Sequence, residues 1–277
     1  MFLDNIIPSA DLLDYIRKYT IVDVLFPSAV PVPFKAYPPH PQHCLQFYPR
    51  DTETFSFNNG ANNYCGKRIV VTGQHTRVSN RYIGRDFLTL QVVFQPGALY
   101  RLTGIPASEL NNTYLDADLI MGAEVNLVNE QLFYAKSHRQ MIEIVEQYLR
   151  KLIRLSRKAA HPLDAVAGSM LLFAGEYPVL DWFAREACLS ARQFNRKFIE
   201  RMGVNPKLFM RIVRFWSAYK MKNRFPEKDW LAIALHTGYC DYQHLVKEYK
   251  DFTEMTPVAF TELECKSPER CFGDAEV

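Results

Sequence analysis

One short pattern occurs twice in the C-terminal part of this chain, and its spacing constrains the fold more than any other feature. Matching residues of the two copies lie 51 positions apart: Phe194 and Leu245, Phe198 and Tyr249, Pro206 and Pro257, Phe209 and Phe260. The earlier pair Ala184 and Ala234 lies 50 apart, so the second copy has one more residue in its turn. A fixed period of this kind predicts that one structural unit is built twice.

Each copy predicts two short helices joined by a tight turn. In the first copy an apolar helix from Leu180 to Ala187 precedes Ser190, a residue type that caps helix N-termini. Phe194 and Phe198 lie four positions apart, so they share a helix face that can pack on the preceding helix. The corresponding residues of the second copy are Asp241, Leu245 and Tyr249. This arrangement is typical of a helix-turn-helix, whose second helix keeps a polar face free.

The free faces carry side chains suited to DNA. Arginine recognises guanine edges, asparagine and glutamine recognise adenine edges, and lysine binds phosphates. We predict contacts from both second helices and from the helix that links the copies. The predicted DNA-binding residues are Arg192, Gln193, Asn195, Arg196 and Lys197 in the first recognition helix, Lys207 and Arg211 in the linking helix, and Tyr242, Gln243, His244 and Lys247 in the second recognition helix.

Basic residues are concentrated in the first copy and the linking helix. The whole chain has a formal net charge of only +3, which carries no argument for nucleic acid. Between Arg185 and Arg224, however, eleven Lys or Arg residues accompany two acids, a local charge of +9 (11 − 2). A solvated helix face also carries charges, but next to two helix-turn-helix patterns this segment favours a phosphate-binding surface.

The two copies resemble the paired helix-turn-helix domain of AraC-type transcription regulators over about residues 161–264. The residues that carry the resemblance are Ser190, Phe194, Phe198, Gly203 and Pro206, and then Ile233-Ala234, Gly238-Tyr239, Asp241, Leu245, Tyr249 and Thr256-Pro257. Ala187 and Leu245 stand where the family usually has Gly and Phe, but both retain a packing role. The resemblance implies a regulator that binds a specific DNA sequence.

The expected linking helix explains how one chain could read two sites. It starts at Asn205-Pro206, ends near Phe225-Pro226 and spans roughly 18 residues, or about 27 Å at 1.5 Å per residue. Successive major grooves on one face of DNA lie about 34 Å apart. A helix of this length, with its ends, can hold two recognition helices in adjacent grooves.

The N-terminal part has a different texture. Residues 9–20 carry apolar side chains at helical spacing and predict a short helix. After them, runs rich in β-branched and aromatic residues alternate with Gly, Asn and Pro, which predicts a β-sandwich or barrel. The expected strands are Ile21–Phe26, Cys44–Tyr48, Thr54–Phe57, Lys67–Thr72, Arg77–Tyr82 and Phe87–Phe94, followed by helical pieces at Ala98–Leu102 and Pro106–Leu110.

This region resembles the β-barrel sensor-like domain that often precedes a paired helix-turn-helix in bacterial regulators. The resemblance covers about residues 8–132 and is carried by Gln91-Val92-Val93-Phe94, Pro96-Gly97-Ala98, Thr103-Gly104-Ile105-Pro106 and Glu109-Leu110. It implies a cupin-like fold, so the expected fold class is α+β. Aromatic residues in this part either line a pocket or form the barrel core: Phe34, Tyr37, Phe47, Tyr48, Phe55, Phe57 and Tyr64.

Cysteine and histidine residues give no recognised metal or catalytic pattern. His40, His43, Cys44, Cys65 and His75 lack the spacing of known ligand sets, so neither a metal nor a cofactor is expected. Cys188 and Cys240 fall in the two turns and are expected to be small packing residues. Acidic residues near the start rule out a signal pattern, and no apolar run approaches a membrane span, so a cytoplasmic, nucleoid-associated protein is expected.

A third segment connects the two parts. From Lys136 to Lys158 an apolar stripe at helical spacing predicts one helix, which His161-Pro162 ends. This helix either packs on its own barrel or serves in dimerisation or coupling. The expected organisation is residues 1–135 as the sensor-like domain, 136–160 as the connecting helix, 161–264 as the DNA-binding domain and 265–277 as a tail.

The sequence therefore predicts a transcription regulator without enzymatic activity. Its expected partners are double-stranded DNA, a small-molecule effector and a second copy of itself, with no membrane. The alternative is a barrel-type enzyme or binding protein whose helical tail mediates protein contacts. DNA-repair proteins also carry AraC-like modules, but they use a Pro-Cys-His-type nucleophile, and here Cys44 follows His43 and precedes Leu45.

Overall fold

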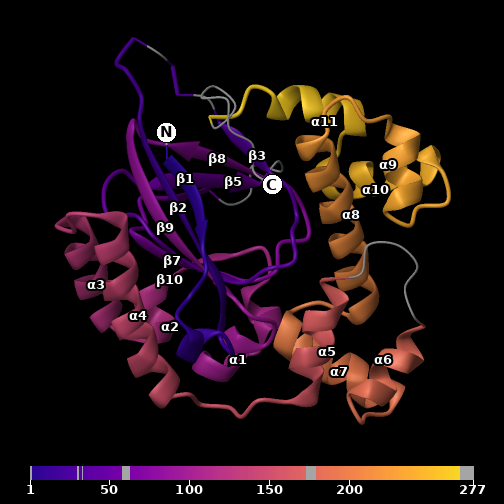
Figure 1. Cartoon of the computed structure of the whole chain (residues 1–277), viewed down its shortest axis with the longest axis horizontal. Coiled ribbons are helices and arrows are strands. Elements are labelled where there is room, and N and C mark those ends of the chain that lie inside the picture. The colour runs from indigo at the N-terminus through magenta and orange to yellow at the C-terminus, as the bar shows by residue number, and fades with distance from the viewer. Residues whose placement is uncertain (1, 30, 33, 58–62, 173–178, 269–277) are drawn as a thin grey trace.

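The computed structural model describes residues 2–29, 31–32, 34–57, 63–172 and 179–268. The N-terminal half contains two antiparallel sheets with helices on one side, and the C-terminal half is helical (Figure 1). The α+β class predicted from the sequence is confirmed. No helix in the described ranges is long and apolar enough to cross a lipid bilayer.

The larger sheet has six strands in the order β1-β2-β9-β4-β7-β10. They are β1 (Phe2–Ile6), β2 (Ile16–Leu25), β4 (Cys44–Phe47), β7 (Ile69–Thr72), β9 (Asp86–Phe94) and β10 (Tyr114–Asp116). The smaller sheet has the order β3-β8-β5-β6. Its strands are β3 (Lys35–Tyr37), β5 (Glu53–Phe57), β6 (Asn63–Cys65) and β8 (Ser79–Ile83). The described strands of the two sheets form a cupin-like double layer and do not pair into a closed barrel.

Side-chain alternation on the larger sheet creates two cores. Leu45 and Phe47 point toward the helices that cover the outer face, where one apolar cluster lies. Val70 belongs to a second cluster between the two sheets, together with Tyr48 and Phe55. The covering helices are α1 (Ala98–Thr103), α2 (Ala117–Met121), α3 (Glu124–Phe133) and α4 (His138–Arg154), with a 3-10 turn at Ala107–Leu110.

The helix predicted at residues 9–20 is wrong. Only Ala10–Leu12 form a 3-10 turn, and from Ile16 onward the chain is strand β2, paired with β9. The register shifts between Ile16 and Lys18, so the buried residues Ile16 and Tyr19 lie three positions apart. A β-bulge adds one residue to a strand and thereby imitates helical spacing.

The connecting helix packs on its own domain. Met141, Val145 and Leu149 of α4 are buried in the cluster that α4 shares with the six-stranded sheet. The apolar stripe that the sequence left open between dimerisation and packing is therefore used within the chain.

The remaining helices form the C-terminal domain. They are α5 (Pro162–Met170), α6 (Leu180–Glu186), α7 (Ala191–Met202), α8 (Pro206–Arg224), α9 (Trp230–His236), α10 (Tyr242–Thr253) and α11 (Pro257–Glu264). In Figure 1, α8 runs between a lower group, α5 to α7, and an upper group, α9 to α11. Each group has its own apolar core, and residues of α8 contribute to both.

The expectation for the turn cysteines is wrong. Cys188 and Cys240 are exposed. The packing positions of the two turns are instead Ala187 and Tyr239, which are buried in the cores of their respective groups.

Candidate nucleic-acid interface

The first candidate reader is α7, whose start is closed by a capping box. Ser190 Oγ accepts a hydrogen bond from the Gln193 backbone N–H (3.3 Å), and Gln193 Oε1 accepts one from the Ser190 N–H (3.1 Å). Phe194 and Phe198 are buried against the neighbouring helices. The predicted contact residues Arg192, Gln193, Asn195 and Arg196 are exposed, and Lys197 is half-buried.

The second candidate reader is α10. The Asp241 carboxylate accepts a hydrogen bond from the His244 N–H (2.7 Å) and caps the helix, as its sequence predicts. Leu245 and Tyr249 are buried in the upper core, again as predicted. The predicted contacts Gln243 and Lys247 are exposed, whereas Tyr242 and His244 are half-buried.

The linking helix α8 begins at Asn205, whose side chain accepts a hydrogen bond from the Leu208 N–H (2.8 Å). Lys207, a predicted phosphate contact, lies exposed in the first turn. Arg211, the other predicted phosphate contact, is half-buried and bound to two carboxylates. Its Nε donates to both oxygens of Glu248 (3.0 and 3.2 Å) and its guanidinium donates to Asp251 (2.7 Å).

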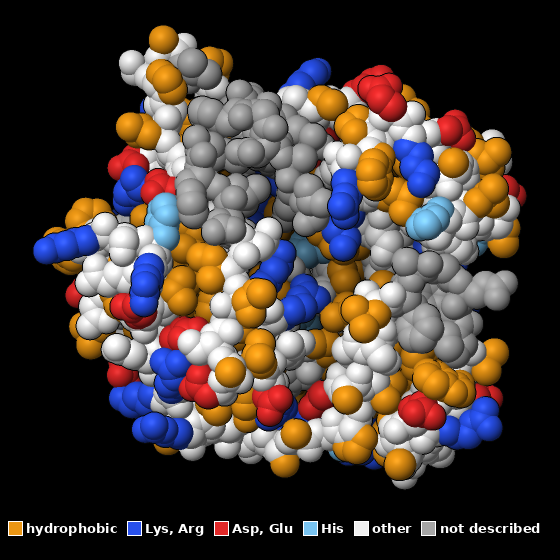
Figure 2. All heavy atoms as spheres, viewed as in Figure 1, with side chains coloured by type: hydrophobic (Ala, Val, Ile, Leu, Met, Phe, Trp, Pro, Cys, Tyr) orange, Lys and Arg blue, Asp and Glu red, His pale blue; other side chains and the backbone are white. Residues whose placement is uncertain are grey.

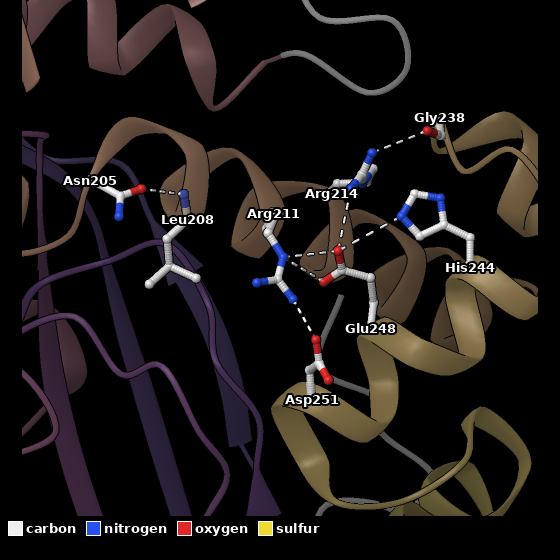
Figure 3. A network of polar contacts seen from close by, with 8 residues as sticks. All are labelled: Asn205, Leu208, Arg211, Arg214, Gly238, His244, Glu248 and Asp251. Atoms are coloured by element: carbon white, nitrogen blue, oxygen red, sulfur yellow. Dashed lines mark hydrogen bonds and ion pairs between the residues drawn. The ribbon is translucent and has the colours of Figure 1, made fainter.

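Figure 3 shows that these contacts form a network between α8 and the second helix-turn-helix unit. Glu248 is 4 % exposed and also accepts a long contact from Arg214 (3.4 Å). Arg214 donates to the carbonyl of Gly238, in the turn that precedes α10 (3.3 Å). The neighbouring carboxylates raise the pKa of Arg211 against the opposing effect of its burial. The network therefore links α8 to both the turn and the recognition helix.

A cleft lies between α8, α10 and the start of α6. Its charged lining consists of the basic residues Lys207, Arg211, Arg214, His244 and Lys247 and the acidic residues Glu248 and Asp251. On the face that Figure 2 shows, basic side chains are mixed with acidic and apolar ones.

The sensor-like domain touches the first unit through polar contacts at the end of α7. Asn111 Nδ2 donates to the Gly203 carbonyl (2.6 Å), and His43 Nε2 lies 3.2 Å from the Met202 carbonyl. Tyr100 donates to Glu200 (2.7 Å). Gly203 has φ 87°, and a Cβ there would lie 2.3 Å from Asn111 Oδ1, so a glycine is needed both for conformation and for space.

The same domain enters the apolar core of the second unit. Ala36 and Val78 are buried in one cluster with residues of α8, α9, α10 and α11, and Phe34 packs against that cluster. The Val78 N–H donates to the Phe252 carbonyl at the end of α10 (2.9 Å). The ring of His40 lies 4.9 Å from that of Trp216 on α8.

A cavity lies between the two sheets of the sensor-like domain. Its polar lining includes Lys35, Glu53 and Arg81, and its apolar lining includes Val22 and Phe87. The Tyr48 hydroxyl donates to Glu53 (3.1 Å), and burial raises the pKa of Glu53. The Arg81 guanidinium lies 3.5 Å from the centre of the Tyr37 ring.

The structure separates the aromatic residues that were predicted either to line a pocket or to form the barrel core. Tyr37 lines the cavity, whereas Phe47, Tyr48, Phe55 and Phe57 lie in the apolar clusters of the N-terminal domain. Phe34 packs on the second helix-turn-helix unit. The Tyr64 side chain lies outside the described residues.

Cys44, His43 and His75 are buried in the packed interior of the protein. Burial raises the pKa of the Cys44 thiol to about 12, and it lowers the pKa of His43 to about 4. The ring of His75 stacks on that of Tyr114 at 4.9 Å. Among the described residues, no three His, Cys, Asp or Glu side chains cluster as a metal site, and the Cys65 side chain is outside that set.

Comparison with known families settles the C-terminal domain. A model described as a helix-turn-helix domain matches residues 183–262, the stretch that contains both units and the linking helix. The C-terminal domain is a helix-turn-helix domain of the AraC type. A second model, a domain of unknown function, matches residues 4–116 of the chain. No curated protein sequence matches it significantly.

Solved structures of ToxT from Vibrio cholerae share the whole architecture. An apo ToxT variant has a TM-score of 0.50 at 9 % identity, over 90 % of this chain and 97 % of that one. Wild-type ToxT bound to an unsaturated fatty acid has a TM-score of 0.50 at 10 % identity, over 95 % and 98 % of the two chains. At this identity the likeness concerns the fold: a sheet domain followed by a paired helix-turn-helix.

Proposed function

We propose that this regulator reads two adjacent major grooves, one with α7 and one with α10. The supporting observation is that both helices are capped, expose polar faces and are held by one linking helix. The helix α8 has 19 residues, so it is about 28 Å long at 1.5 Å per residue. Recognition elements in adjacent grooves need a separation of about 34 Å, which the ends of α8 and the two turns can supply.

Within this proposal the predicted contacts take different roles. Arg192, Asn195 and Arg196 read bases from α7, and Gln243 with Tyr242 reads bases from α10. The phosphate contacts are Lys197, Lys207, His244 and Lys247. Gln193 remains at the DNA surface, although its oxygen serves the capping box.

Arg211 is not assigned as a phosphate contact. Its guanidinium is bound to Glu248 and Asp251, and releasing it would leave the buried Glu248 with fewer partners. We assign it to holding the second unit on α8.

The N-terminal domain senses a small molecule in the cavity between its sheets. The side chains that line the cavity include two cations, Lys35 and Arg81, and one acid, Glu53, among largely apolar neighbours. Such a lining suits a small organic acid with an apolar body. ToxT, which shares the fold, has been solved with an unsaturated fatty acid and with a substituted butenoic acid.

The role is regulatory and not catalytic. The Cys44 thiol is buried with a raised pKa, which opposes nucleophilic chemistry, and His43 is used in an interdomain contact. We place the protein in the cytoplasm on chromosomal DNA, with domain limits at 1–135, 136–160, 161–264 and 265–277. A homodimer would need a surface other than the apolar stripe of α4, which is occupied.

The test is a mobility shift with DNA from upstream of the protein's own gene, at two salt concentrations and with scrambled DNA as control. Specific binding that weakens with salt, and a footprint over two successive major grooves, are expected. A footprint confined to one groove would contradict the two-reader arrangement. Equal binding to both DNAs would contradict sequence-specific recognition.

A further inference from the structure

One pair of strands is shared between the cavity and the second helix-turn-helix unit. In the antiparallel pair β3–β8, Lys35 lies opposite Arg81, and Ala36 lies opposite Asn80. Successive side chains of a strand point to opposite faces of the sheet. The strand pair therefore has a cavity face and a face toward the DNA-binding domain.

The two faces carry different residues. Lys35, Tyr37, Arg81 and Ile83 line the cavity. On the other face, Ala36 is 3 % exposed and is buried in the core of the second unit. Val78, which directly precedes β8, is 4 % exposed and belongs to the same core. One layer of backbone thus separates the cavity from the core of the second unit.

The C-terminal segment makes a second connection to the same cavity. Pro268, which follows α11, is one of the cavity-lining residues, and Ser267 beside it is 1 % exposed. Glu264 at the end of α11 is buried and accepts a hydrogen bond from Tyr219 of α8. Figure 1 shows α11 beside the strand pair and the top of α8. The cavity lining therefore includes a residue of the segment that directly follows the DNA-binding domain.

Among the described residues, the first unit shares no apolar cluster with the sheets. Its cluster is formed by residues between Leu163 and Val213. The sensor-like domain packs on α7 through α1 and the 3-10 turn at Ala107–Leu110, with polar contacts at Glu200, Met202 and Gly203. Apolar cores are packed as densely as crystals and transmit small displacements, whereas hydrogen bonds at a surface can re-form with water.

Arg81, on β8, is the side chain through which a ligand would displace the strand pair β3–β8, the wall between the cavity and the second unit. It is 7 % exposed, and its Nε–H is buried without a hydrogen-bond partner in the described part of the chain. Its nearest carboxylate, Glu53, lies 3.7 Å away, beyond good hydrogen-bond distance. An anion in the cavity would offer the acceptor that Arg81 Nε lacks.

We propose that the strand pair β3–β8 is the element through which an acidic ligand in the cavity changes the position of the second helix-turn-helix unit. The inference rests on the proposed sensing function, but the wall itself can be tested without a ligand. A bulky side chain added to the cavity face of β8 acts as a permanent occupant. The same bulk added to the opposite cavity wall, on β2, reduces the cavity without pressing on the second unit.

The experiment compares Ile83→Trp on β8 with Val22→Trp on β2, both at half-buried positions that line the cavity. Amide hydrogen exchange of α10 is measured, together with affinity for the DNA site. Ile83→Trp should change α10 exchange and DNA affinity by about fivefold or more, the lower range of typical couplings. Val22→Trp should leave both within about twofold, as expected for an uncoupled site.

A third variant tests the path. Val78→Ala removes apolar contact on the other face, so adding it to Ile83→Trp should bring α10 exchange to within about twofold of Val78→Ala alone. Equal effects of the two tryptophans, or an effect that survives Val78→Ala, would overturn the proposal, as would no effect of either tryptophan. Should a tryptophan variant not fold, Ile83→Phe and Val22→Phe make the same comparison with less bulk.

The two proposals fail in different ways. Wild-type protein that does not bind specific DNA would refute the proposed function, while hydrogen exchange of α10 would still decide the coupling. Normal DNA binding with unaltered exchange in Ile83→Trp would refute the coupling alone.

Discussion

Arg211 Nε on the linking helix donates to both carboxylate oxygens of Glu248 on the second recognition helix, over 3.0 and 3.2 Å. The contact crosses from α8 to α10 and, through Arg214, reaches the turn at Gly238. It holds α10 against α8, because Glu248 is buried and its carboxylate oxygens are directed at α8.

Glu248→Gln should therefore loosen the second reader. Removing one partner of a buried ion pair leaves the others unpaired, so the free energy of unfolding should fall by about 3 kcal/mol. Binding to a DNA site with both half-sites should weaken, while binding to the α7 half-site should not. Urea unfolding and mobility shifts measure the two effects, with the exposed Glu227→Gln as the control. Unchanged preference for half-site spacing would argue against this role.

The first reader should carry more affinity than the second. Arg196→Ala should cost about 1–3 kcal/mol of specific binding, because arginine makes two hydrogen bonds to guanine. Gln243→Ala should cost less, since α10 presents fewer free charges. Titrations on one defined site compare the variants, with Arg139→Ala as the control because that side chain is 90 % exposed on the connecting helix α4, outside the DNA-binding domain. A larger loss in Gln243→Ala would reverse the order.

Lys207 and Arg211 should respond differently to substitution although both were predicted to bind phosphate. Lys207→Ala should reduce the slope of log affinity against log salt by about one, as expected for one lost phosphate contact. Arg211→Ala should leave that slope unchanged and lower stability, because it removes the partners of Glu248 and Asp251. Salt-dependent titrations and thermal unfolding distinguish the roles of Lys207 and Arg211. A changed salt slope in Arg211→Ala would show that Arg211 binds phosphate.

The cavity should distinguish an acid from a neutral molecule of the same shape. Hexanoate should raise the thermal midpoint of the wild type more than 1-hexanol does, because Arg81 favours an anion. Arg81→Gln should remove that difference, whereas Arg85→Gln, outside the cavity lining, should not. Equal shifts by the two probes in the wild type would exclude recognition of the acid group.

Acid should lower the free energy of unfolding because His43 is buried. Burial lowers the pKa of His43 to about 4, below the ordinary value of 6.5. The unfolded state therefore binds the proton more readily than the folded state. The contribution of His43 to the free energy of unfolding is fully present above about pH 6.5 and is lost as the pH falls toward 4. The loss is on the order of 3 kcal/mol for this group. His75, whose pKa burial also lowers, adds to the same decline.

Chemical unfolding at several pH values measures this decline, and His43→Gln should make it shallower. An equally steep decline in the variant would assign the effect to other groups.

Local sequence determined the repeated unit. The caps at Ser190 and Asp241 and the buried pair Phe194 and Phe198 depend on residues three or four positions apart, and the structure confirms them. Strands β4, β5, β7, β8 and β9 and the second half of β2 were also predicted, whereas β1, β3, β6 and β10 were not. The first half of β2 was predicted to be helical. There the bulge at Ile16 produced a helical spacing, and pairing with the distant β9 decided the outcome.

Tertiary structure decided which charges are free. In the part of the chain that the structure describes, three of the eleven basic residues between Arg185 and Arg224 pair with acids outside that segment: Arg201 with Asp164, Arg211 with Glu248 and Asp251, and Arg214 with Glu248. These partners lie 34 to 40 positions away in the chain. A local charge count cannot include them, because an ion pair depends on distance in space and not on separation along the sequence.

The wall between the cavity and the second unit also depends on distance in space and not on separation along the sequence. The sequence alone determined that the chain has two recognition helices on one linking helix. Only the folded structure brings Ala36 and Val78 into the core of residues 212–260 while Lys35 and Arg81 face the cavity. Burial of apolar surface between distant segments is non-directional and leaves no spacing in the sequence, so the fold had to decide it.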